Sequence, residues 1–365
     1  MERSKKIIRT SFIGIAVNLV LVAFKAAVGL ITGSVAIIMD AVNNLSDALS
    51  SVITVIGTKL SGRAPDKKHP YGHGRVEYIT SALISVIVLV TGVISLKESI
   101  EKIITPEKAT YGVASIVIIV AAIAAKLIIG LYVRGVGKKL NSGALEASGS
   151  DALFDAVLSG GTLIAALISI IWGLTLEGWF GAVISVFIIK AGIELLGDTV
   201  SSIIGKRADK ELTGKIKETL CSYEGVRGCY DLTLHNYGPE RLIGSAHIEV
   251  PDEMTAKQIH KLTRNISTDI YMKYGIILTI GIYASNSDEE TAKIRETLNS
   301  ITAEYPGILQ VHGFYADLEQ KTVTFDLVID FSADSQAICD GVVGKMKAAY
   351  PGFEFFAVLD SDYSD

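Results

Sequence analysis

Long apolar runs dominate residues 1–204, whereas residues 205–365 have the mixed composition of a water-soluble protein. A membrane-spanning helix needs about 20 mainly apolar residues. Six runs meet that length, at roughly residues 11–32, 34–58, 77–98, 111–133, 144–173 and 179–200. The pattern therefore predicts an α-helical membrane domain with six transmembrane helices, the first two forming a tight hairpin because Gly33 and Ser34 alone separate them.

Lysine and arginine alternate from one side of these spans to the other. The N-terminus, the 59–75 and 134–139 connections and the segment after span six are basic. The 33–34 and 174–179 connections carry no Lys or Arg. Because cytoplasmic loops are enriched in these residues, both termini and the soluble half are predicted to lie in the cytoplasm.

A six-residue motif recurs in the soluble half, as KIKETL at 215–220 and KIRETL at 293–298. Each copy is followed by two alternating strands, a helix and a last strand. Chance similarity is the alternative for so short a motif, but the matching order of elements favours a duplication. The sequence therefore predicts two small α+β sandwiches, at residues 205–284 and 285–365, behind a membrane domain at 1–204.

Composition and motifs argue against several classes of protein. The mean hydropathy of +0.42 coexists with 20% charged residues, as expected when charge is confined to part of the chain. The three cysteines all lie in the soluble half without CxxC spacing, which argues against a disulfide framework and a thiolate zinc site. No Walker-type or Ser-His-Asp arrangement indicates an enzyme, and no nucleic-acid partner is expected.

Carboxylates interrupt the second and fifth apolar runs, where each costs roughly 2.5–3.5 kcal/mol at mid-bilayer. Asn43 and Asp47 are four residues apart, as are Asp151 and Asp155, so each pair shares one helix face. Two facing pairs place four oxygen-bearing side chains around one point, as a divalent cation requires. Asp40 is the weaker member, either supporting these ligands or capping the hairpin.

Structural ion pairing is the alternative explanation, since Lys25, Lys126 and Lys190 also lie within apolar runs. Two i,i+4 pairs on different helices favour a metal site over that reading. No histidine falls within a span, so the ligands are oxygen atoms. Such a donor set suits magnesium, calcium and manganese better than zinc.

A second set of metal-binding side chains lies in the connection between spans two and three. Asp66, His69 and His73 are spaced to converge on one ion in a turn shaped by proline and glycine. A solvated basic loop is the plain alternative.

These segments closely resemble the cation diffusion facilitator family. The matching signatures are Gly33-Ser34-Val-Ala, DAVNNLSD at 40–47, DKKHPYGHGR at 66–75 and the acidic pair of span five. The similarity covers residues 1–284, that is, six spans and one ferredoxin-like cytoplasmic domain. It implies a homodimeric exporter in the lipid bilayer that exchanges a cytoplasmic divalent metal for protons by alternating access.

The resemblance also assigns ligands by position. It places the transport site on Asn43, Asp47, Asp151 and Asp155, and a loop site on Asp66, His69 and His73. Zinc-transporting relatives usually carry a histidine among the four transport positions. This sequence carries Asn and Asp there, which resembles the manganese-exporting subgroup.

The family's cytoplasmic zinc site is incomplete in this sequence. Its histidines would fall near Tyr230, His247, His260 and Gly281, and two of the four are histidine here. The site is therefore expected to be incomplete or rebuilt, with His235 or acidic residues as the replacement ligands. Residues 285–365 extend beyond the common pattern, and a regulatory or dimer-forming domain is the natural expectation.

The leading interpretation is a proton-coupled manganese exporter of the bacterial inner membrane. Zinc, iron or cobalt export by the same route is one alternative, because most sites bind zinc more tightly than manganese. A membrane metal sensor that does not transport is another, of a different class.

Overall fold

The computed structural model describes residues 2–32, 35–105, 113–172 and 176–361. Within the second helix, the side chains of Asp40 and Asn43 lie outside the described part. The chain divides into two compact units: residues 1–206 with 237–240, and residues 207–236 with 241–365.

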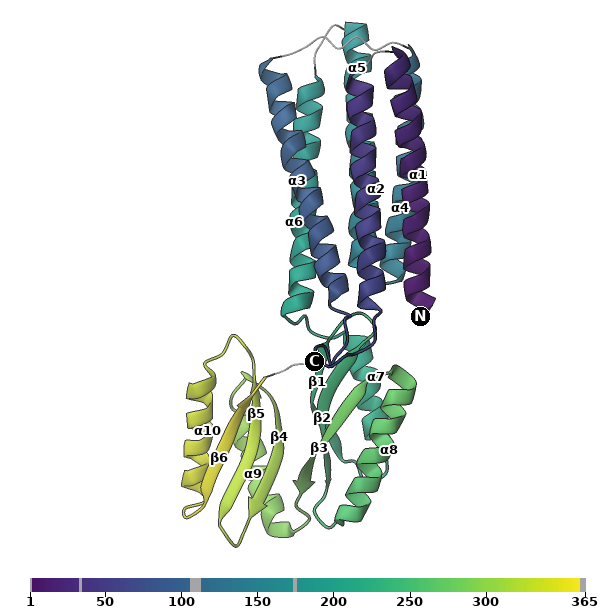
Figure 1. Ribbon diagram of the computed structural model, residues 1–365. Helices are drawn as coiled ribbons and strands as arrows, with labels where there is room; N and C mark the ends of the chain where they lie inside the picture. The colour runs from purple at the N-terminus through teal and green to yellow at the C-terminus, as the bar shows by residue number, and fades with distance from the viewer. Residues whose placement is uncertain (1, 33–34, 106–112, 173–175, 362–365) are drawn as a thin grey trace. The chain divides into compact units, whose positions relative to one another are not determined.

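Among the described residues, the first unit contains six long helices (Figure 1). They are α1 (Glu2–Thr32), α2 (Val35–Ser61), α3 (Val76–Ile104), α4 (Val113–Lys139), α5 (Gly143–Trp172) and α6 (Glu177–Ile204). Within the described residues, each predicted span lies in one of these helices. By length and composition, α1, α3, α4 and α6 could cross a membrane. The other two long helices, α2 and α5, carry Asp47, Asp151 and Asp155 within their apolar sequences. The prediction of a helical membrane domain is confirmed.

The helices pack in pairs, α1 with α2, α3 with α6 and α4 with α5. At Gly149 of α5, an added Cβ would lie 2.4 Å from the backbone nitrogen of Arg134 on α4. A side chain there would separate the two backbones, so this glycine permits the close approach that small residues give to membrane helices. This contact positions α4 and α5 for the site described below.

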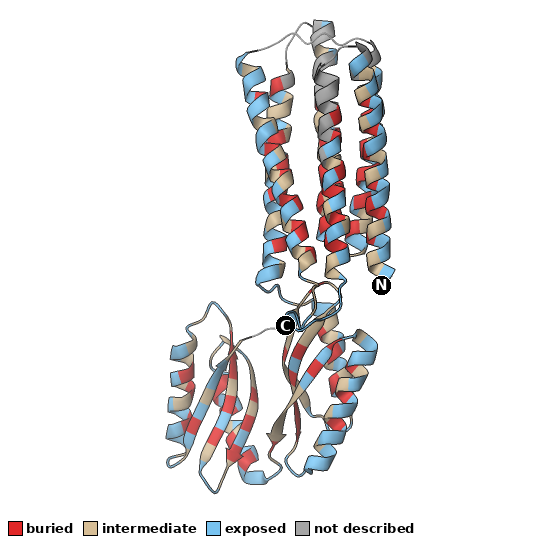
Figure 2. Cartoon of the chain, in the orientation of Figure 1, coloured by how far each residue is buried: buried red, intermediate tan, exposed pale blue. Residues whose placement is uncertain are grey.

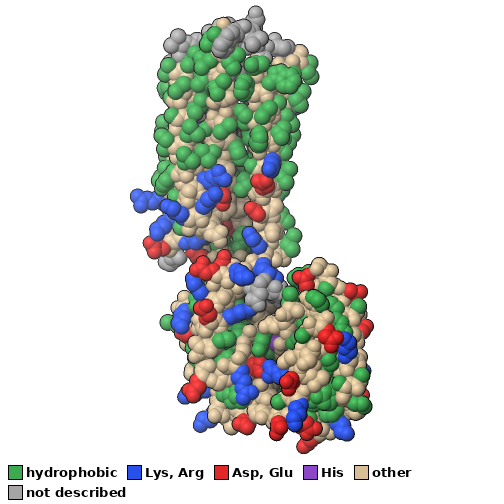
Figure 3. Space-filling view, turned by 180° about the vertical axis from the view of Figure 1, so that it is seen from behind, with side chains coloured by type: hydrophobic (Ala, Val, Ile, Leu, Met, Phe, Trp, Pro, Cys, Tyr) green, Lys and Arg blue, Asp and Glu red, His purple; other side chains and the backbone are tan. Residues whose placement is uncertain are grey.

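Apolar side chains cover the outside of the helical unit. Ile128, Leu131 and Phe187 are each more than 60% exposed, and Figure 2 shows buried positions on the inward faces of the helices. In Figure 3, hydrophobic side chains cover most of the length of this unit, with charged ones gathered toward one end. Such a surface is stable in lipid, where helices satisfy their own backbone hydrogen bonds.

A buried ion pair joins three helix ends. Arg3 of α1 donates to both carboxylate oxygens of Glu77 on α3, at 2.9 and 2.7 Å, and the Glu77 side chain is 3% exposed. The same guanidinium donates to the carbonyl oxygens of Leu140 and Asn141, between α4 and α5. Arginine suits this role because its planar group presents several donors in fixed geometry.

The second unit contains four helices and six strands among the described residues, in the order α-β-β-α-β twice. The first set is α7 (Lys210–Cys221), β1 (Gly228–Asn236), β2 (Leu242–Pro251), α8 (Ala256–Tyr274) and β3 (Ile277–Ser285). The second is α9 (Glu289–Thr302), β4 (Ile308–Asp317), β5 (Thr322–Ile329), α10 (Ser335–Ala349) and β6 (Glu354–Asp360). We call these two sets the first and second repeat.

Each repeat forms one three-stranded sheet with its strands in sequence order. The first two strands of each sheet pair antiparallel and the last two pair parallel. A parallel pair needs a crossover connection, and α8 and α10 supply it. The four helices of this unit begin at N-cap residues of the preferred types. The side chains that accept backbone hydrogen bonds at these N-termini are Asp209, Thr255, Asp288 and Asp334.

Each sheet buries one face against its own two helices. Ile216 of α7 and Ile266 of α8 pack with Ile248 in the first core. A separate core, with Phe325 and Val342 at its centre, fills the second repeat. The expected α+β architecture is thus confirmed, and the strand faces that turn away from the helices are free to carry polar groups.

Candidate metal centre

Charged side chains from three helices meet inside the helical unit. Lys126 of α4 lies with its Nζ 3.0 Å from Oδ2 of Asp47 on α2, and it donates a second hydrogen bond to Asp155 on α5. The side chains are 5%, 13% and 11% exposed, respectively. Two aspartates on different helices therefore converge on one position, which the lysine nitrogen holds.

The remaining sequence candidates lie beside this cluster as far as they are described. Asp151, one turn before Asp155, is 8% exposed and interacts electrostatically with Asp155, Asp47 and Lys126. The side chain of Asn43 is outside the described residues, but its backbone position on α2 puts it on the face of Asp47. The neighbouring Asn44 is fully buried, and its amide has no hydrogen-bond partner within the described part of the chain.

This arrangement has more negative than positive charge. When ionised, three aspartates face one ammonium group, and their burial leaves little water to compensate the excess. Buried charges require partners or a bound ion. Ion pairing, the alternative explanation, does occur at Lys126. The single positive charge of that lysine neutralises only one of the three carboxylates, however, and two negative charges remain. Lys190, by contrast, is exposed and pairs with Glu194 on its own helix.

The loop candidates Asp66, His69 and His73 come together. His69 Nδ1 lies 3.3 Å from one Asp66 oxygen and His73 Nε2 lies 3.5 Å from the other. All three ligand atoms lie within 4.8 Å of one another. The side chains of Asp66 and His69 are more than half exposed, whereas His73 is 16% exposed.

Backbone geometry prepares Asp66 for this role. The amides of His69 and Lys68 donate to its Oδ1 at 2.7 and 2.8 Å. These hydrogen bonds hold the pKa of Asp66 below its usual range, so the carboxylate is ionised near neutral pH. Gly72 has a φ of +87°, which only glycine adopts easily, and turns the chain back toward His73.

The three cytoplasmic candidates, His235, His247 and His260, are not brought together. His235 on β1 and His260 on α8 are exposed. His247 on β2 instead contacts Asp231, with its Nδ1 2.8 Å from Oδ2. Among the described residues, no group of three or more close ligand atoms includes any of the three histidines.

The structure groups residues that sequence reasoning did not select. Asp231 of β1, His312 of β4 and Asp326 of β5 offer ligand atoms within 4.8 Å of one another. Burial alone raises the pKa of Asp231, but its interactions with His247, His312 and Tyr283 outweigh burial and hold the pKa well below its usual range. A signal was present, since the repeat places His312 and Asp326 directly opposite each other on paired strands.

Comparison with known proteins identifies both units. Residues 11–204 match the cation efflux transmembrane domain, and residues 208–282 match the cytoplasmic domain of cation efflux proteins. The transporter MJ0449 of Methanocaldococcus jannaschii is 29% identical over 266 residues, covering 72% of this chain and 91% of that protein.

Two further relatives carry descriptive names. The manganese efflux system protein MneP of Bacillus subtilis is 27% identical over 297 residues, 79% of this chain and 99% of that protein. The cation-efflux pump FieF of Cronobacter sakazakii is 25% identical over 243 residues, 67% of this chain and 81% of that protein. Because the transmembrane match alone spans more than half of the sequence, the chain belongs to the cation efflux family, the cation diffusion facilitators, and is a membrane transporter of divalent metal cations.

Proposed function

We propose that this chain exports manganese(II) from the cytoplasm in exchange for protons, through Asn43, Asp47, Asp151 and Asp155. The observation that carries the proposal is the convergence of Asp47 and Asp155, from α2 and α5, on a single cation position. Residues on two different helices allow a movement between the helices to open the site to one side at a time.

Oxygen ligands support manganese as the ion. The proposed set contains carboxylates and one amide, which are hard ligands, and imidazole is absent from it. The likeness to a manganese efflux protein agrees with this choice, whereas a relative named for cation efflux in general leaves room for zinc, iron or cobalt. Uptake of these four ions into vesicles under an imposed pH gradient compares them directly, and a rate highest for zinc would overturn the manganese assignment.

Proton coupling follows from the same carboxylates. When the metal leaves, buried aspartates retain negative charge that protons can neutralise. Lys126 donates to two of these carboxylates, so its ammonium group competes with an incoming ion for the same oxygens. Protons and the lysine together replace the charge of the departing metal.

The remaining parts of the proposal concern organisation. We place the transport domain at residues 1–204 and the two cytoplasmic domains at 205–284 and 285–365. The chain acts as a homodimer in the bacterial inner membrane, in line with its match to the cytoplasmic domain of cation efflux proteins. The basic connections support a cytoplasmic position for both termini. A metal sensor without transport remains the contrasting class, and flux measurement separates it from the proposal.

Ion choice is expected to shift when Asn43 is replaced by histidine. Imidazole is a softer nitrogen donor that suits zinc, and the exchange removes a hard oxygen ligand. The zinc-to-manganese transport ratio should rise by about tenfold, corresponding to about 1.4 kcal/mol of altered preference. Initial rates at one fixed pH gradient measure the ratio, with Asn299→His, at an exposed position on α9, as the control. An unchanged ratio in Asn43→His would remove Asn43 from the ligand set.

The loop site is expected to bind one metal ion of its own. Replacing His69 and His73 together by alanine should remove one bound ion per chain, because Asp66 alone offers too few ligands. Transport should fall less than in an Asp47 variant, since these residues lie outside the membrane helices. Metal analysis after equilibrium dialysis tests this, and an unchanged stoichiometry would show that the loop is a solvated connection.

A further inference from the structure

His312 is a buried histidine whose ring nitrogens make no hydrogen bond. The residue lies on β4 and is 1% exposed, and neither Nδ1 nor Nε2 has a hydrogen-bond partner of acceptable geometry in the described part of the chain. Its ring stacks on Tyr230 with centroids 5.0 Å apart and an interplanar angle of 9°. The ring is therefore held by packing; Nδ1 has no polar partner among the described residues, and Nε2 faces carboxylate oxygens at ion-pair distance without the angle of a hydrogen bond.

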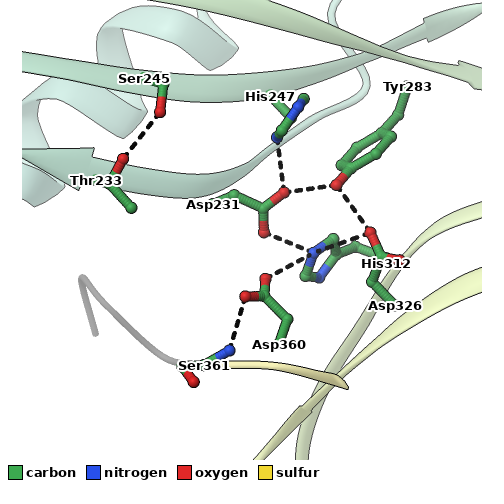
Figure 4. Close-up of polar contacts among 9 residues, drawn as sticks. All are labelled: Asp231, Thr233, Ser245, His247, Tyr283, His312, Asp326, Asp360 and Ser361. Carbon is green, nitrogen blue, oxygen red and sulfur yellow. Dashed lines mark hydrogen bonds and ion pairs between the residues drawn. The ribbon is translucent and has the colours of Figure 1, made fainter. Parts of the chain in front are cut away.

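Three carboxylates from both repeats surround this ring (Figure 4). His312 Nε2 lies 2.6 Å from Asp231 Oδ1, 3.5 Å from Asp360 Oδ2 and 3.8 Å from Asp326 Oδ2. Ligand atoms about 2.1 Å from a metal ion lie about 3.0–3.4 Å from their neighbours. The observed spacings bracket that range, so a small shift of each side chain would accommodate one ion.

Among the described residues, the hydrogen-bond donors around this cluster are fewer than its six carboxylate oxygens: His247 Nδ1 lies 2.8 Å from Asp231 Oδ2, and the backbone amide of Ser361 donates to Asp360 Oδ1 at 2.7 Å. The Tyr283 hydroxyl lies 2.6 Å from an oxygen of Asp231 and 2.8 Å from an oxygen of Asp326, yet it carries one proton to donate. Among the ion pairs of the described residues, no Lys or Arg contacts the three aspartates. The cluster thus has more acceptor atoms than donors, and when all three aspartates are ionised their negative charge exceeds the single positive charge that His312 can carry.

The backbone turns these side chains toward one another at irregular points of the strands. Asp231 has a φ of +52°, uncommon for a residue other than glycine, at the irregularity of β1 between Tyr230 and Thr233. The second repeat has the matching irregularity after His312, where Gly313 has a φ of +61°. Bulges re-aim side chains and recur beside functional sites, where local strain is tolerated.

We propose that Asp231, His312 and Asp326 hold a divalent metal ion between the two repeats, with Asp360 as a fourth ligand. One imidazole and three carboxylates suit manganese, iron, cobalt or zinc. The ion neutralises the excess charge and links β1 of the first repeat to β4 and β5 of the second. This site is separate from the membrane cluster, and the inference does not depend on which ion the chain transports.

Metal analysis of the purified full-length protein tests the site, with manganese and zinc as separate probes. His312→Ala and Asp326→Asn should each lose one bound ion per chain, because each removes a direct ligand. Asp340→Asn, an exposed aspartate on α10, should retain the wild-type number. Asp326→Asn keeps the shape of the side chain, so it serves even where His312→Ala fails to fold.

Cobalt supplies a spectroscopic readout that does not rely on counting. The wild-type protein should show visible absorption of cobalt(II) bound by nitrogen and oxygen, and His312→Ala should change or abolish the component assigned to this site. Added metal should also slow amide exchange in β1, β4 and β5, which carry the ligands, in the wild type but not in His312→Ala. Equal metal content and equal exchange in folded wild type and variants would overturn the site and leave a cluster held by shared protons. Transport activity plays no part in these readouts, so failure here is distinguishable from failure of the proposed function.

Discussion

Replacing Asp155 by asparagine is expected to lower manganese transport more than about 100-fold. The substitution keeps the size of the side chain but removes a charge that faces Lys126 and the proposed ion position. Removing one partner of a buried charged pair costs about 3–5 kcal/mol, and each 1.4 kcal/mol is a factor of about ten. Initial manganese uptake into proteoliposomes measures the loss, with equal amounts of inserted protein.

A matched control distinguishes the loss of a metal ligand from the loss of a negative charge elsewhere on the protein. Asp198→Asn changes an exposed aspartate on α6 and should leave uptake within about twofold of wild type, because surface charges contribute little. Asp47→Asn, at the other aspartate that contacts Lys126, should behave as Asp155→Asn does. Normal uptake by either cluster variant would contradict the transport site.

Replacing Lys126 by methionine is expected to tighten metal binding and slow turnover. The ammonium group contacts Asp47 and Asp155, so an incoming ion competes with it for the same oxygens. Without the lysine, buried carboxylates have protons or metal as their remaining counter-ions. Manganese affinity should rise at least about tenfold, or about 1.4 kcal/mol, while release becomes slower because no internal cation replaces the metal.

Binding and transport have to be measured on the same preparation for this variant. Calorimetric titration gives the dissociation constant, and vesicle uptake at saturating manganese gives the maximal rate. Lys190→Met is the control, since Lys190 is exposed and pairs with Glu194 on its own helix. Weaker manganese binding by Lys126→Met would show instead that the lysine holds the aspartates in place for the metal.

Much of the fold could be predicted because its signals are local. The length of the apolar runs predicted the helices of the membrane domain, and the alternation of strands predicted the order of elements in the two repeats. The spacing of Asp151 and Asp155 likewise predicts a shared helix face, and both side chains are buried. Local periodicity reports which face of an element is buried.

Other features depend on contacts between distant segments. Lys126 was one of several lysines in apolar runs, and nothing local distinguished it from Lys190, which is exposed. The cluster around His312 needs two strand irregularities and the pairing of separate repeats before its carboxylates meet. Strand periodicity assigns a face but cannot anticipate a bulge that turns a side chain such as Asp231 to another direction.

Simultaneous recording of manganese and proton movement in the same proteoliposomes tests the central claim most directly. With wild-type protein, manganese added outside should enter the vesicles while protons leave. In vesicles loaded with manganese, an imposed inward proton gradient should drive the metal out. Both movements should disappear in Asp155→Asn, which lacks one carboxylate of the cluster. Manganese binding by the wild-type protein without flux of either ion above that of empty vesicles would contradict the account and indicate a sensor.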